Sequence, residues 1–456
     1  MPLPPGPDGL VAINTVRWLR DPFGFLEQAH ARFGDTFTLR LAMLTVVIVS
    51  DPETVKQVFA LGPDEAHAGE ANAVLKAFLG PSSLLLLDGA AHQRHRKMMQ
   101  PAFHGERMHA YGRTMIDLAN GSIDGWPIGR PFAVHKPMQS VTLDVIIRTV
   151  FGVEEGARFR RLAGLLKDLL DTGTSPLLLF PFMQRDLGRL TPWKRLQDVG
   201  ARSSEILREE IRAGRERGTA GRTDVLAMML DARDEAGQPL SEDEIHDELV
   251  TLLLAGHETT ATSLAWALRW ILPDANLVAR LRDEIATAAG DPERIAKLPL
   301  LDATVKESLR LQPIVPVVGR LLKQPMRIGG MDLPRGTIVS PAIYLVHRRP
   351  SLYPDPTRFR PERFLTFKPS PSEWLPFGGG LRRCIGAAFA VYEMKMVLST
   401  LLPRVDARLA KDNVRVVRRS ITLAPGAGLP IVVTARRSRP VAGKPRQAVA
   451  TESASP

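Results

Sequence analysis

A long apolar helix is the feature of this sequence that most restricts its fold. Ser241 and Glu244 form a Ser-x-x-Glu capping box, and a helical pattern runs from there to about Leu272. About 30 residues at roughly 1.5 Å each span roughly 45 Å, the width of a whole domain. The middle, Leu249–Ala255, is apolar on nearly every side except at Thr251, so we expect it to be buried. The rest of the chain must therefore fold around this helix.

The remaining sequence is mostly helical, with short strands on either side of the helical region. Residues Thr36–Ser50 resemble a pair of hairpin strands, and Asp51–Leu311 follows a helical pattern. Short strands return over Val315–Ile343, a further helix is expected over Ala387–Leu402, and a strand pair over Val414–Thr434. We therefore predict a mainly α fold with small β-sheets, of the α+β class.

The segments outside this pattern set the expected domain limits. We predict an irregular Pro/Gly-rich lead-in over residues 1–21, a single domain over 22–435 and a disordered tail over 436–456. Two apolar segments, Gly62–Leu87 and Asp171–Pro192, are interrupted by Gly and Pro. Such loops either cap a binding cavity or simply cover the core, and the sequence leaves both alternatives open.

Composition excludes several classes of protein. The chain has 456 residues and one cysteine, so it has no internal disulfide and no zinc site built on several cysteines. It has neither a secretory signal nor an apolar run of about 20 residues, so we expect a cytoplasmic monomer without a membrane anchor. The net charge of +11 would attract nucleic acid, anionic lipid or an acidic protein, but no nucleic-acid motif accompanies it.

Two unfavourable residues lie together directly after the apolar part of the long helix, in the segment Ala255-Gly256-His257-Glu258-Thr259-Thr260. Glycine inside a helix costs about 1 kcal/mol relative to alanine, and a buried carboxylate costs more unless it is satisfied. We predict that Gly256 leaves a notch for a small ligand, that Thr259 donates a hydrogen bond to it, and that Glu258 relays protons. The alternative is a helix kink with a threonine that bonds back to the preceding turn.

The single cysteine lies in a second unusual segment, Pro376–Gly386, which reads P-F-G-G-G-L-R-R-C-I-G. Glycines allow the backbone to approach a flat cofactor, and amide groups near a helix start stabilise a thiolate. Arg382 is expected to lower the pKa of the Cys384 thiol and to pair with a carboxylate, and Phe377 to shield the sulfur. The alternative is that a lone cysteine is a small buried hydrophobic residue.

Together the two segments resemble the cytochrome P450 superfamily. The family's signature F-x-x-G-x-R-x-C-x-G is matched in full, and the segment 255–260 is similar to its oxygen-activation motif A-G-x-[DE]-T-T. The resemblance extends from about Pro22 to Val433. It implies a P450-like fold that holds haem b between the long helix and the cysteine loop, with Cys384 as the thiolate ligand of the iron. It also implies that Glu258 and Thr259 act in catalysis by delivering protons to dioxygen. The signature residues are Phe377, Gly380, Arg382, Cys384 and Gly386.

The same resemblance assigns two further sets of residues. His92 and Arg96 fit an H-x-x-x-R pattern and, with Arg320 and Arg382, are expected to bind the haem carboxylates. A second set is expected to form a buried structural network around the haem, and consists of Glu307, Arg310 and Arg363. The remaining predicted cofactor contacts are Ala255, Gly256, Phe377, Gly378 and Gly386.

As a member of this family the chain is expected to be a monooxygenase that inserts one atom of dioxygen into an apolar small molecule, such as a fatty acid, terpenoid or steroid. Electrons would come from NAD(P)H through a ferredoxin or flavodoxin and its reductase, attracted by a basic patch of Arg94, Lys97, Arg382 and Arg383. The predicted substrate-binding residues are Leu252, Ala255, Val315, Val317, Val318 and Leu423.

Two other functions are compatible with a haem-thiolate chain. One is a peroxygenase, isomerase or dehydratase that does not activate dioxygen. The other is a haem-based sensor or a lipid-binding protein without catalysis. The adjacent acid and alcohol, Glu258 and Thr259, argue against both alternatives.

Overall fold

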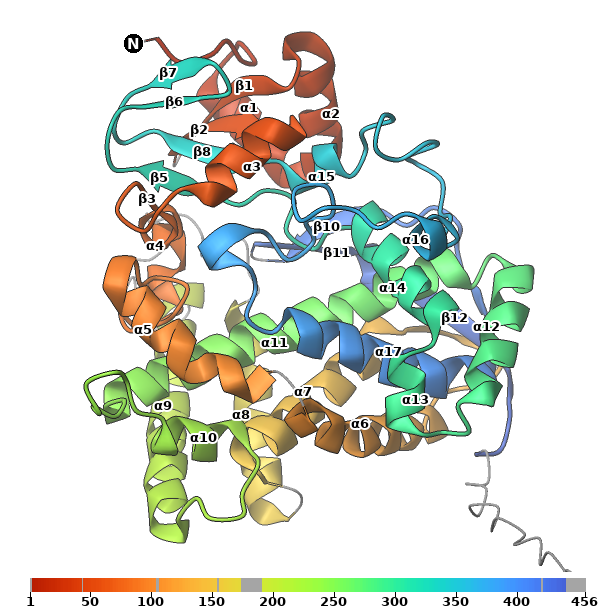
Figure 1. Cartoon of the computed structure of the whole chain (residues 1–456). Coiled ribbons are helices and arrows are strands. Elements are labelled where there is room, and N and C mark those ends of the chain that lie inside the picture. Colours follow the sequence, from red (N-terminus) through yellow and green to blue (C-terminus); the bar gives the residue numbers. More distant parts are fainter. Residues whose placement is uncertain are drawn as a thin grey trace, which may run out of the picture.

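The long helix predicted from the capping box lies at the centre of the molecule. In the computed structural model it is α11 (Glu242–Ile271), and it crosses the middle of the view in Figure 1. The Ser241 hydroxyl accepts a hydrogen bond from the Glu244 amide at 3.2 Å, and the Glu244 carboxylate accepts one from the Ser241 amide at 2.7 Å. Both halves of the capping box are therefore present, and the expected helix is confirmed. The structure describes residues 2–42, 44–103, 106–153, 156–173, 191–419 and 421–439.

Helices surround α11 on most sides. Its most extensive packing is against α7 (His135–Phe151), while α14 (Pro299–Leu311) and α17 (Ala387–Arg404) pack near its C-terminal half. Leu253, Leu264 and Leu268 are at most 1% exposed, as expected for a helix that is apolar nearly all round. The other long helices are α2 (Pro22–Phe33), α3 (Pro52–Ala60), α5 (Gly89–Met99), α6 (Glu106–Asp124), α8 (Ala157–Gly173), α9 (Pro192–Arg217), α10 (Val225–Asp231) and α12 (Ala275–Thr287).

Short helical segments join these elements. Several are single turns that place loops around the centre of the molecule, and α13 begins with a proline at its first turn, where no backbone amide is needed. The short segments are α4 (Ala68–Ala71), α13 (Pro292–Ala296), α15 (Ile343–Val346), α16 (Arg363–Thr366) and the 3₁₀ turns at Ala73–Ala77, Gln100–Phe103, Gly380–Arg382 and Gly426–Gly428.

A small sheet lies at one end of the molecule, at the top left of Figure 1. The predicted hairpin is confirmed, because β1 (Thr36–Leu41) pairs antiparallel with β2 (Leu44–Val49). The sheet has the order β1-β2-β8-β5-β3, and β8 runs parallel to β2. Its remaining strands are β3 (Ala66–His67), β5 (Arg320–Leu322) and β8 (Ile338–Pro341).

Three smaller sheets complete the described strands. β6 (Met326–Ile328) pairs with β7 (Met331–Leu333), and β10 (Val416–Arg419) pairs with β11 (Thr422–Pro425). The expected C-terminal strand pair is therefore present as β10 and β11, but a third strand follows it. This strand, β12 (Pro430–Arg436), lies between β4 (Pro131–Ala133) and β9 (Val405–Leu409).

One sequence expectation at the N-terminus is wrong. The predicted irregular lead-in contains a regular helix, α1 (Val11–Arg20), which packs against β1. Its buried side has Asn14 and Thr15, and the Thr15 hydroxyl accepts a hydrogen bond from the Ala42 amide at 2.8 Å. Arg17 and Arg20 lie in its last turn, where cations interact favourably with the helix dipole. The predicted disordered tail lies outside the described residues from position 440 onward.

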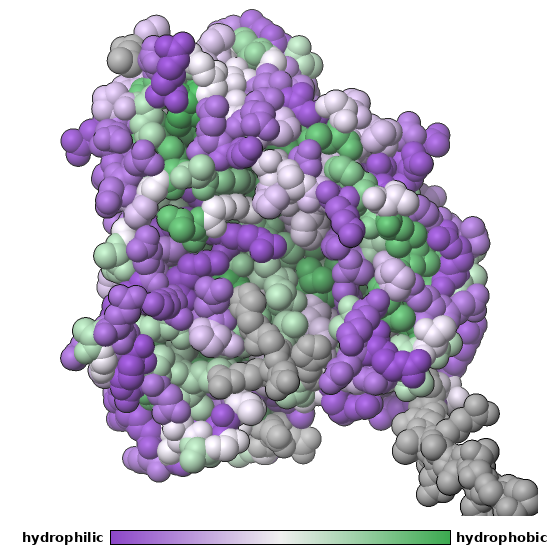
Figure 2. Space-filling view, viewed as in Figure 1, coloured by the Kyte–Doolittle hydropathy of each residue, from purple (hydrophilic) through white to green (hydrophobic). Residues whose placement is uncertain are grey.

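The surface is mainly hydrophilic around its outline, and hydrophobic residues gather toward the middle of the face in Figure 2. Among the helices that the structure describes, none has the combination of length and apolar composition that a bilayer crossing requires.

Candidate functional site

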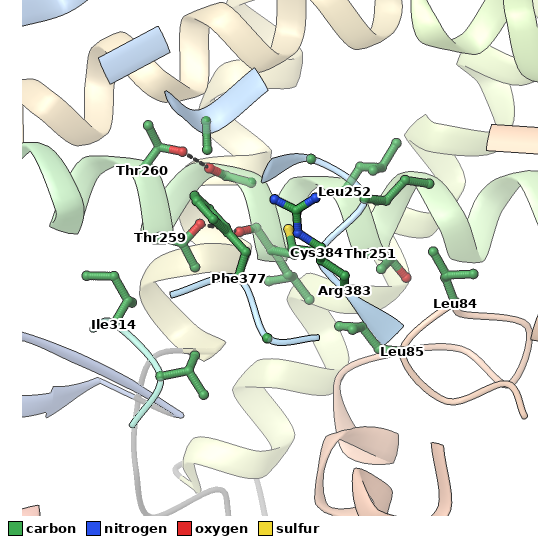
Figure 3. Close-up of a pocket in the computed structure, with 18 of the residues that line it drawn as sticks. Leu84, Leu85, Thr251, Leu252, Thr259, Thr260, Ile314, Phe377, Arg383 and Cys384 are labelled. Carbon is green, nitrogen blue, oxygen red and sulfur yellow. Dashed lines mark hydrogen bonds between the residues drawn. The ribbon is translucent and has the colours of Figure 1, made fainter. Parts of the chain in front are cut away.

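A cavity of about 450 Å³ lies between α11 and the cysteine loop (Figure 3). Its walls come from α5, α7, α11, the segment before β5, the cysteine loop and the β10–β11 hairpin, and most of the lining residues are apolar. The segment Gly62–Leu87 lines it too, so this part of the chain contributes to the cavity and does not merely cover the core. Its lining residues are Ala68, Asn72, Leu75, Phe78, Leu79, Leu84 and Leu85. Most of the second apolar segment, residues 174–190, lies outside the described residues.

Cys384 lines this cavity, and Figure 3 shows it beside Arg383 in the cysteine loop. The Cys384 amide donates a hydrogen bond to the Phe377 carbonyl at 2.9 Å, which closes the loop. Burial raises the pKa of the thiol, whereas the Gly386 amide and the charges of Arg96 and Arg383 lower it. The expectation that Arg382 acidifies the thiol is therefore wrong.

The glycines before Cys384 have a more local role than the sequence suggests. Gly378 and Gly380 have positive φ angles of +66° and +64°, which favour glycine. A Cβ atom on Gly379 or Gly380 would overlap Phe59, the first at its ring and the second at its backbone. These glycines thus let the loop pack against α3, while Gly378 and Gly386 line the cavity, as predicted for cofactor contacts.

Four basic side chains converge at one rim of the cavity. His92 and Arg96 come from α5, Arg320 from β5 and Arg382 from the cysteine loop, and all four line the cavity as predicted. Burial first, and then the charges of the three arginines, lower the pKa of His92 to about 3. Burial followed by the charge of Arg382 lowers the pKa of Arg320 to about 10. The cluster therefore repels further positive charge and suits an anionic group.

Arg382 already has an anionic partner, because it forms an ion pair with Asp88 and donates to the carbonyl groups of Leu84 and Leu87. Arg96 and Arg320 have no ion pair with a carboxylate among the described residues. Arg320 donates to the Gly379 carbonyl at 3.2 Å. Two of the three arginines are thus available to an anionic ligand.

Thr259 lines the opposite side of the cavity, but its hydroxyl bonds back to the Ala255 carbonyl at 2.6 Å. This is the backbone hydrogen bond that the sequence left open as an alternative. A Cβ atom on Gly256 would lie 3.0 Å from Cδ1 of Ile146 on α7, so the neighbouring helix takes up part of the predicted notch. Ala255 and Gly256 both line the cavity, as predicted.

The carboxylate of Glu258 is held from two sides. Arg419 donates to one oxygen at 2.8 Å, and Gln139 donates to the other at 2.7 Å. Burial is the largest influence and raises the pKa of Glu258, while Arg419 and Gln139 lower it. Neither partner was predicted from the sequence, because they lie 161 and 119 residues away from Glu258 and have no motif of their own.

The predicted substrate residues divide into two groups. Leu252, Ala255, Val315 and Val318 line the cavity. Val317 and Leu423 do not, because both pack in the apolar cluster beneath the N-terminal sheet. The Leu423 carbonyl instead accepts a hydrogen bond from Trp266, at 3.0 Å. Side chains alternate along a strand, so the neighbour Thr422 faces the cavity where Leu423 faces away. Ile314, Ile421 and Thr422 line the cavity and were missed.

The three residues of the predicted structural network lie together. Glu307 accepts two hydrogen bonds from Arg310, at 2.7 and 2.9 Å, and one from Arg363 at 3.0 Å. Glu307 and Arg310 are fully buried, and Arg310 also donates to the carbonyl groups of His347 and Pro356. The network thus joins α14 to the chain that precedes the cysteine loop.

Three of the four residues in the predicted basic patch for a redox partner form ion pairs within the chain. Arg94 is paired with Asp234 and Glu244, each at 2.7 Å. Lys97 is paired with Glu235 at 2.6 Å, and Arg382 with Asp88. The cause is that α5 packs beside an acidic stretch that includes the first turns of α11. Of the four predicted residues, Arg383 alone is exposed without a described ion pair.

The sequence of this chain matches one family model and several known proteins. The family model described as cytochrome P450 matches residues 4–424. A Mycobacterium tuberculosis protein provisionally named cytochrome P450 135B1 is 41% identical over 441 residues, which cover 96% of this chain and 92% of that protein. A second protein of that organism, provisionally named cytochrome P450 135A1, is 36% identical over 93% of this chain and 94% of its own length.

A solved structure is similar to this chain over nearly its whole length. It is described as retinoic acid bound cyanobacterial CYP120A1, and it superposes with a TM-score of 0.83 at 28% sequence identity. The alignment covers 95% of this chain and 99% of that chain.

Proposed function

The chain belongs to the cytochrome P450 family of haem-thiolate monooxygenases, and we propose that it inserts one atom of dioxygen into an apolar small molecule. The observation that carries this proposal is the cavity of about 450 Å³, whose walls are mainly apolar and which has Cys384 on one side and Thr259 on the other. Fatty acids, terpenoids and steroids fit such walls, whereas sugars and highly charged molecules do not.

The residues around the cavity fit haem b. A thiol faces the cavity, apolar side chains form its walls, and two cations at its rim, Arg96 and Arg320, have no carboxylate partner in the described part of the chain. Haem b, when bound, supplies the redox chemistry that activates dioxygen. Cys384 would be the thiolate ligand of the iron, and Arg96 and Arg320 would bind the carboxylates, with His92 and Arg382 beside them. Ala255, Gly256, Phe377, Gly378 and Gly386 would line the binding site.

Other residues would act around the bound group. We assign proton delivery to Glu258 and Thr259, because an acid and an alcohol lie next to each other at the cavity wall. We assign a structural role to Glu307, Arg310 and Arg363, because their buried network fixes the chain before the cysteine loop. Leu252, Val315 and Val318 would contact the substrate from the cavity wall.

The electron source belongs to the same proposal. A family member of this kind would receive electrons from NAD(P)H through a separate ferredoxin or flavodoxin and its reductase. The single domain over residues 22–435, the cytoplasmic location and the monomeric state stay predictions from the sequence.

Spectral titration of the purified haem protein tests the substrate class. Retinoic acid, the ligand named for the cyanobacterial structure, is the first probe, together with a saturated fatty acid and a steroid. We expect at least one of these to shift the haem spin state and to yield an oxygenated product with NADPH and a surrogate ferredoxin and reductase. A glucoside of similar size is the control. Shifts with the glucoside but with none of the apolar probes would contradict the proposal.

A further inference from the structure

Three basic side chains at the rim of the main cavity also line a second, smaller hollow. His92, Arg320 and Arg382 line both the cavity beside Cys384 and a hollow of about 20 Å³. Asp88 lines the smaller hollow and is not among the described residues that line the main cavity. Seen from the main cavity, this carboxylate therefore lies behind the rim.

Asp88 is held by donors from two other parts of the chain. Its carboxylate accepts hydrogen bonds from the amides of Gly69 and Glu70, each at 2.9 Å, and it forms an ion pair with Arg382. A Cβ atom on Gly69 would overlap the Leu86 carbonyl and the Asp88 carboxylate, so glycine permits this close approach. The acid thus joins the first turn of α4 to the cysteine loop.

Arg382 is fixed by more than this ion pair. It donates to the Leu84 carbonyl at 3.1 Å and also to the Leu87 carbonyl. These backbone groups accept hydrogen bonds whatever the charge at position 88. A change that removes only the charge of Asp88 should therefore leave the Arg382 side chain in place.

The charge of Asp88 acts on more than its ion-pair partner. Burial is the largest cause that lowers the pKa of Arg320 to about 10, and the charge of Asp88 opposes it. The nearby acid Glu70 is used differently, because its carboxylate binds Lys323 at 2.7 Å and His67 at 2.5 Å. The Glu70 side chain is 45% exposed, against 12% for Asp88. Of these two acids, Asp88 is thus the one whose charge reaches the rim.

The formal charges at the rim match those of a haem b molecule. Arg96, Arg320 and Arg382 carry three positive charges, and His92 is neutral at physiological pH because burial and the three arginines lower its pKa to about 3. Asp88 carries one negative charge, and three positive charges less one leave a net charge of +2. The two carboxylates of haem b carry −2. Without Asp88 the rim would exceed them by one positive charge.

We propose that Asp88 is a positioning residue that fixes Arg382 from behind the rim and reduces the charge of the rim to that of the two haem carboxylates. This inference deepens the proposed monooxygenase function and rests on it. An anion near the haem favours the ferric over the ferrous state, because the iron loses one positive charge on reduction. Asp88 therefore keeps the reduction potential lower, and the haem less tightly held, than three unopposed arginines would.

Asp88→Asn tests the effect of the charge. The asparagine keeps the oxygen that accepts from Gly69 and Arg382 and loses the one that accepts from Glu70. Spectroelectrochemical titration of the haem-loaded protein measures the reduction potential. We expect the equilibrium constant for reduction to rise by a factor on the order of ten, as for a unit charge that water screens only partly. Transfer of haem to excess apomyoglobin should slow by a similar factor.

Glu70→Gln is the matched control. It removes the same charge from the neighbouring acid, whose side chain is more exposed and therefore better screened by water and salt. We expect the equilibrium constant for reduction to change by less than about twofold. Equal shifts in Asp88→Asn and Glu70→Gln, or a lower potential in Asp88→Asn, would overturn the proposal.

A charge-restoring double variant separates charge from structure. Arg382→Gln alone removes a cation, so we expect its potential to fall below that of the wild-type protein. Asp88→Asn combined with Arg382→Gln returns the rim to its original net charge, and its potential should return to near the wild-type value. A purely structural role of Asp88 predicts faster haem loss in Asp88→Asn and no return in the double variant. That result would overturn the charge balance.

The carbon monoxide difference spectrum of each preparation separates this inference from the function on which it rests. A wild-type protein without a thiolate spectrum would refute the proposed function. Thiolate spectra in all preparations, together with the same potential in the wild-type protein and Asp88→Asn, would refute this inference alone. The comparison of Asp88→Asn with Glu70→Gln decides the question even if Arg382→Gln fails to bind haem.

Discussion

Two arginine clusters on either side of the cysteine loop differ in how their charges are balanced. Around Glu307, every oxygen of the carboxylate is used, and Arg310 makes bonds to Glu307 and to backbone carbonyl groups. Around His92, three guanidinium groups share one carboxylate, that of Asp88, which pairs with Arg382. Among the described residues, both oxygens of the carboxylate in the first cluster are used, whereas the second cluster has more positive charge than its one carboxylate neutralises.

This difference separates a structural element from a binding element. A buried network whose carboxylate is fully used holds chain segments in place, and here one nitrogen, Nη2 of Arg363, has no hydrogen-bond partner among the described residues. A cluster with excess cations is costly in the chain alone and becomes favourable when an anionic group enters. The comparison therefore predicts that variants of the first cluster change folding, and that variants of the second change haem retention.

The largest expected effect is that of Glu307→Gln. This change leaves Arg310 and Arg363 without their carboxylate in a site where Arg310 is fully buried, so we expect a loss of about 3–5 kcal/mol in the free energy of unfolding. Urea denaturation measures it. The matched control is Glu362→Gln, which breaks the exposed Glu362–Arg280 pair and should cost less than about 1 kcal/mol. Similar losses in both variants would remove the distinction between the networks.

A smaller effect is expected for Arg96→Gln and Arg320→Gln. Each removes a cation that would bind a haem carboxylate, and hydrogen bonds to charged groups contribute about 1.5–3 kcal/mol, or roughly 10- to 100-fold in haem affinity. Transfer of haem to excess apomyoglobin measures the loss. The urea midpoint of the haem-free chain should stay unchanged or rise, because repulsion within the cluster decreases. Unchanged haem transfer in both variants would contradict the assignment of this rim.

The smallest effect, taken per pH unit, concerns the pH dependence of stability through His92. Its pKa is about 3 in the folded chain against the ordinary 6.5, so between these values the unfolded chain binds a proton that the folded chain does not. Stability is therefore lost as pH falls from about 6.5 toward 3. His92→Gln should reduce this slope by at most about 1.4 kcal/mol per pH unit. Urea unfolding of the haem-free chain between these pH values measures the slope, and an unaltered slope would contradict a neutral, buried His92.

Much of the fold and the centre of the site followed from local sequence patterns. The capping box at Ser241, the glycine-rich loop before Cys384 and the spacing of Glu307 and Arg310 depend on residues close together in the chain, and each appears in the structure where it was expected. The helix α1 was missed although its residues are amphipathic, and its burial is the reverse of what the pattern predicts: Asn14 and Thr15 are buried, whereas Val11, Ile13 and Val16 are exposed.

The site features that were predicted wrongly or missed have a different cause. Which way Leu423 faces depends on the register of a short strand, and a shift by one residue reverses it. The neutralisation of Arg94 depends on Asp234 and Glu244, which are 140 and 150 residues away. The hold of Arg419 on Glu258 likewise needs two distant segments to meet. Such contacts are set by tertiary packing and have no local signature in the sequence.

The carbon monoxide difference spectrum of the dithionite-reduced protein, recorded beside that of Cys384→Ser, tests the central claim most directly. The chain has one cysteine, so a thiolate-ligated haem requires Cys384. We expect the red-shifted Soret band of thiolate-ligated ferrous haem in the wild-type protein and its loss in the variant. A wild-type band typical of histidine ligation, or a thiolate band that persists in Cys384→Ser, would contradict the account.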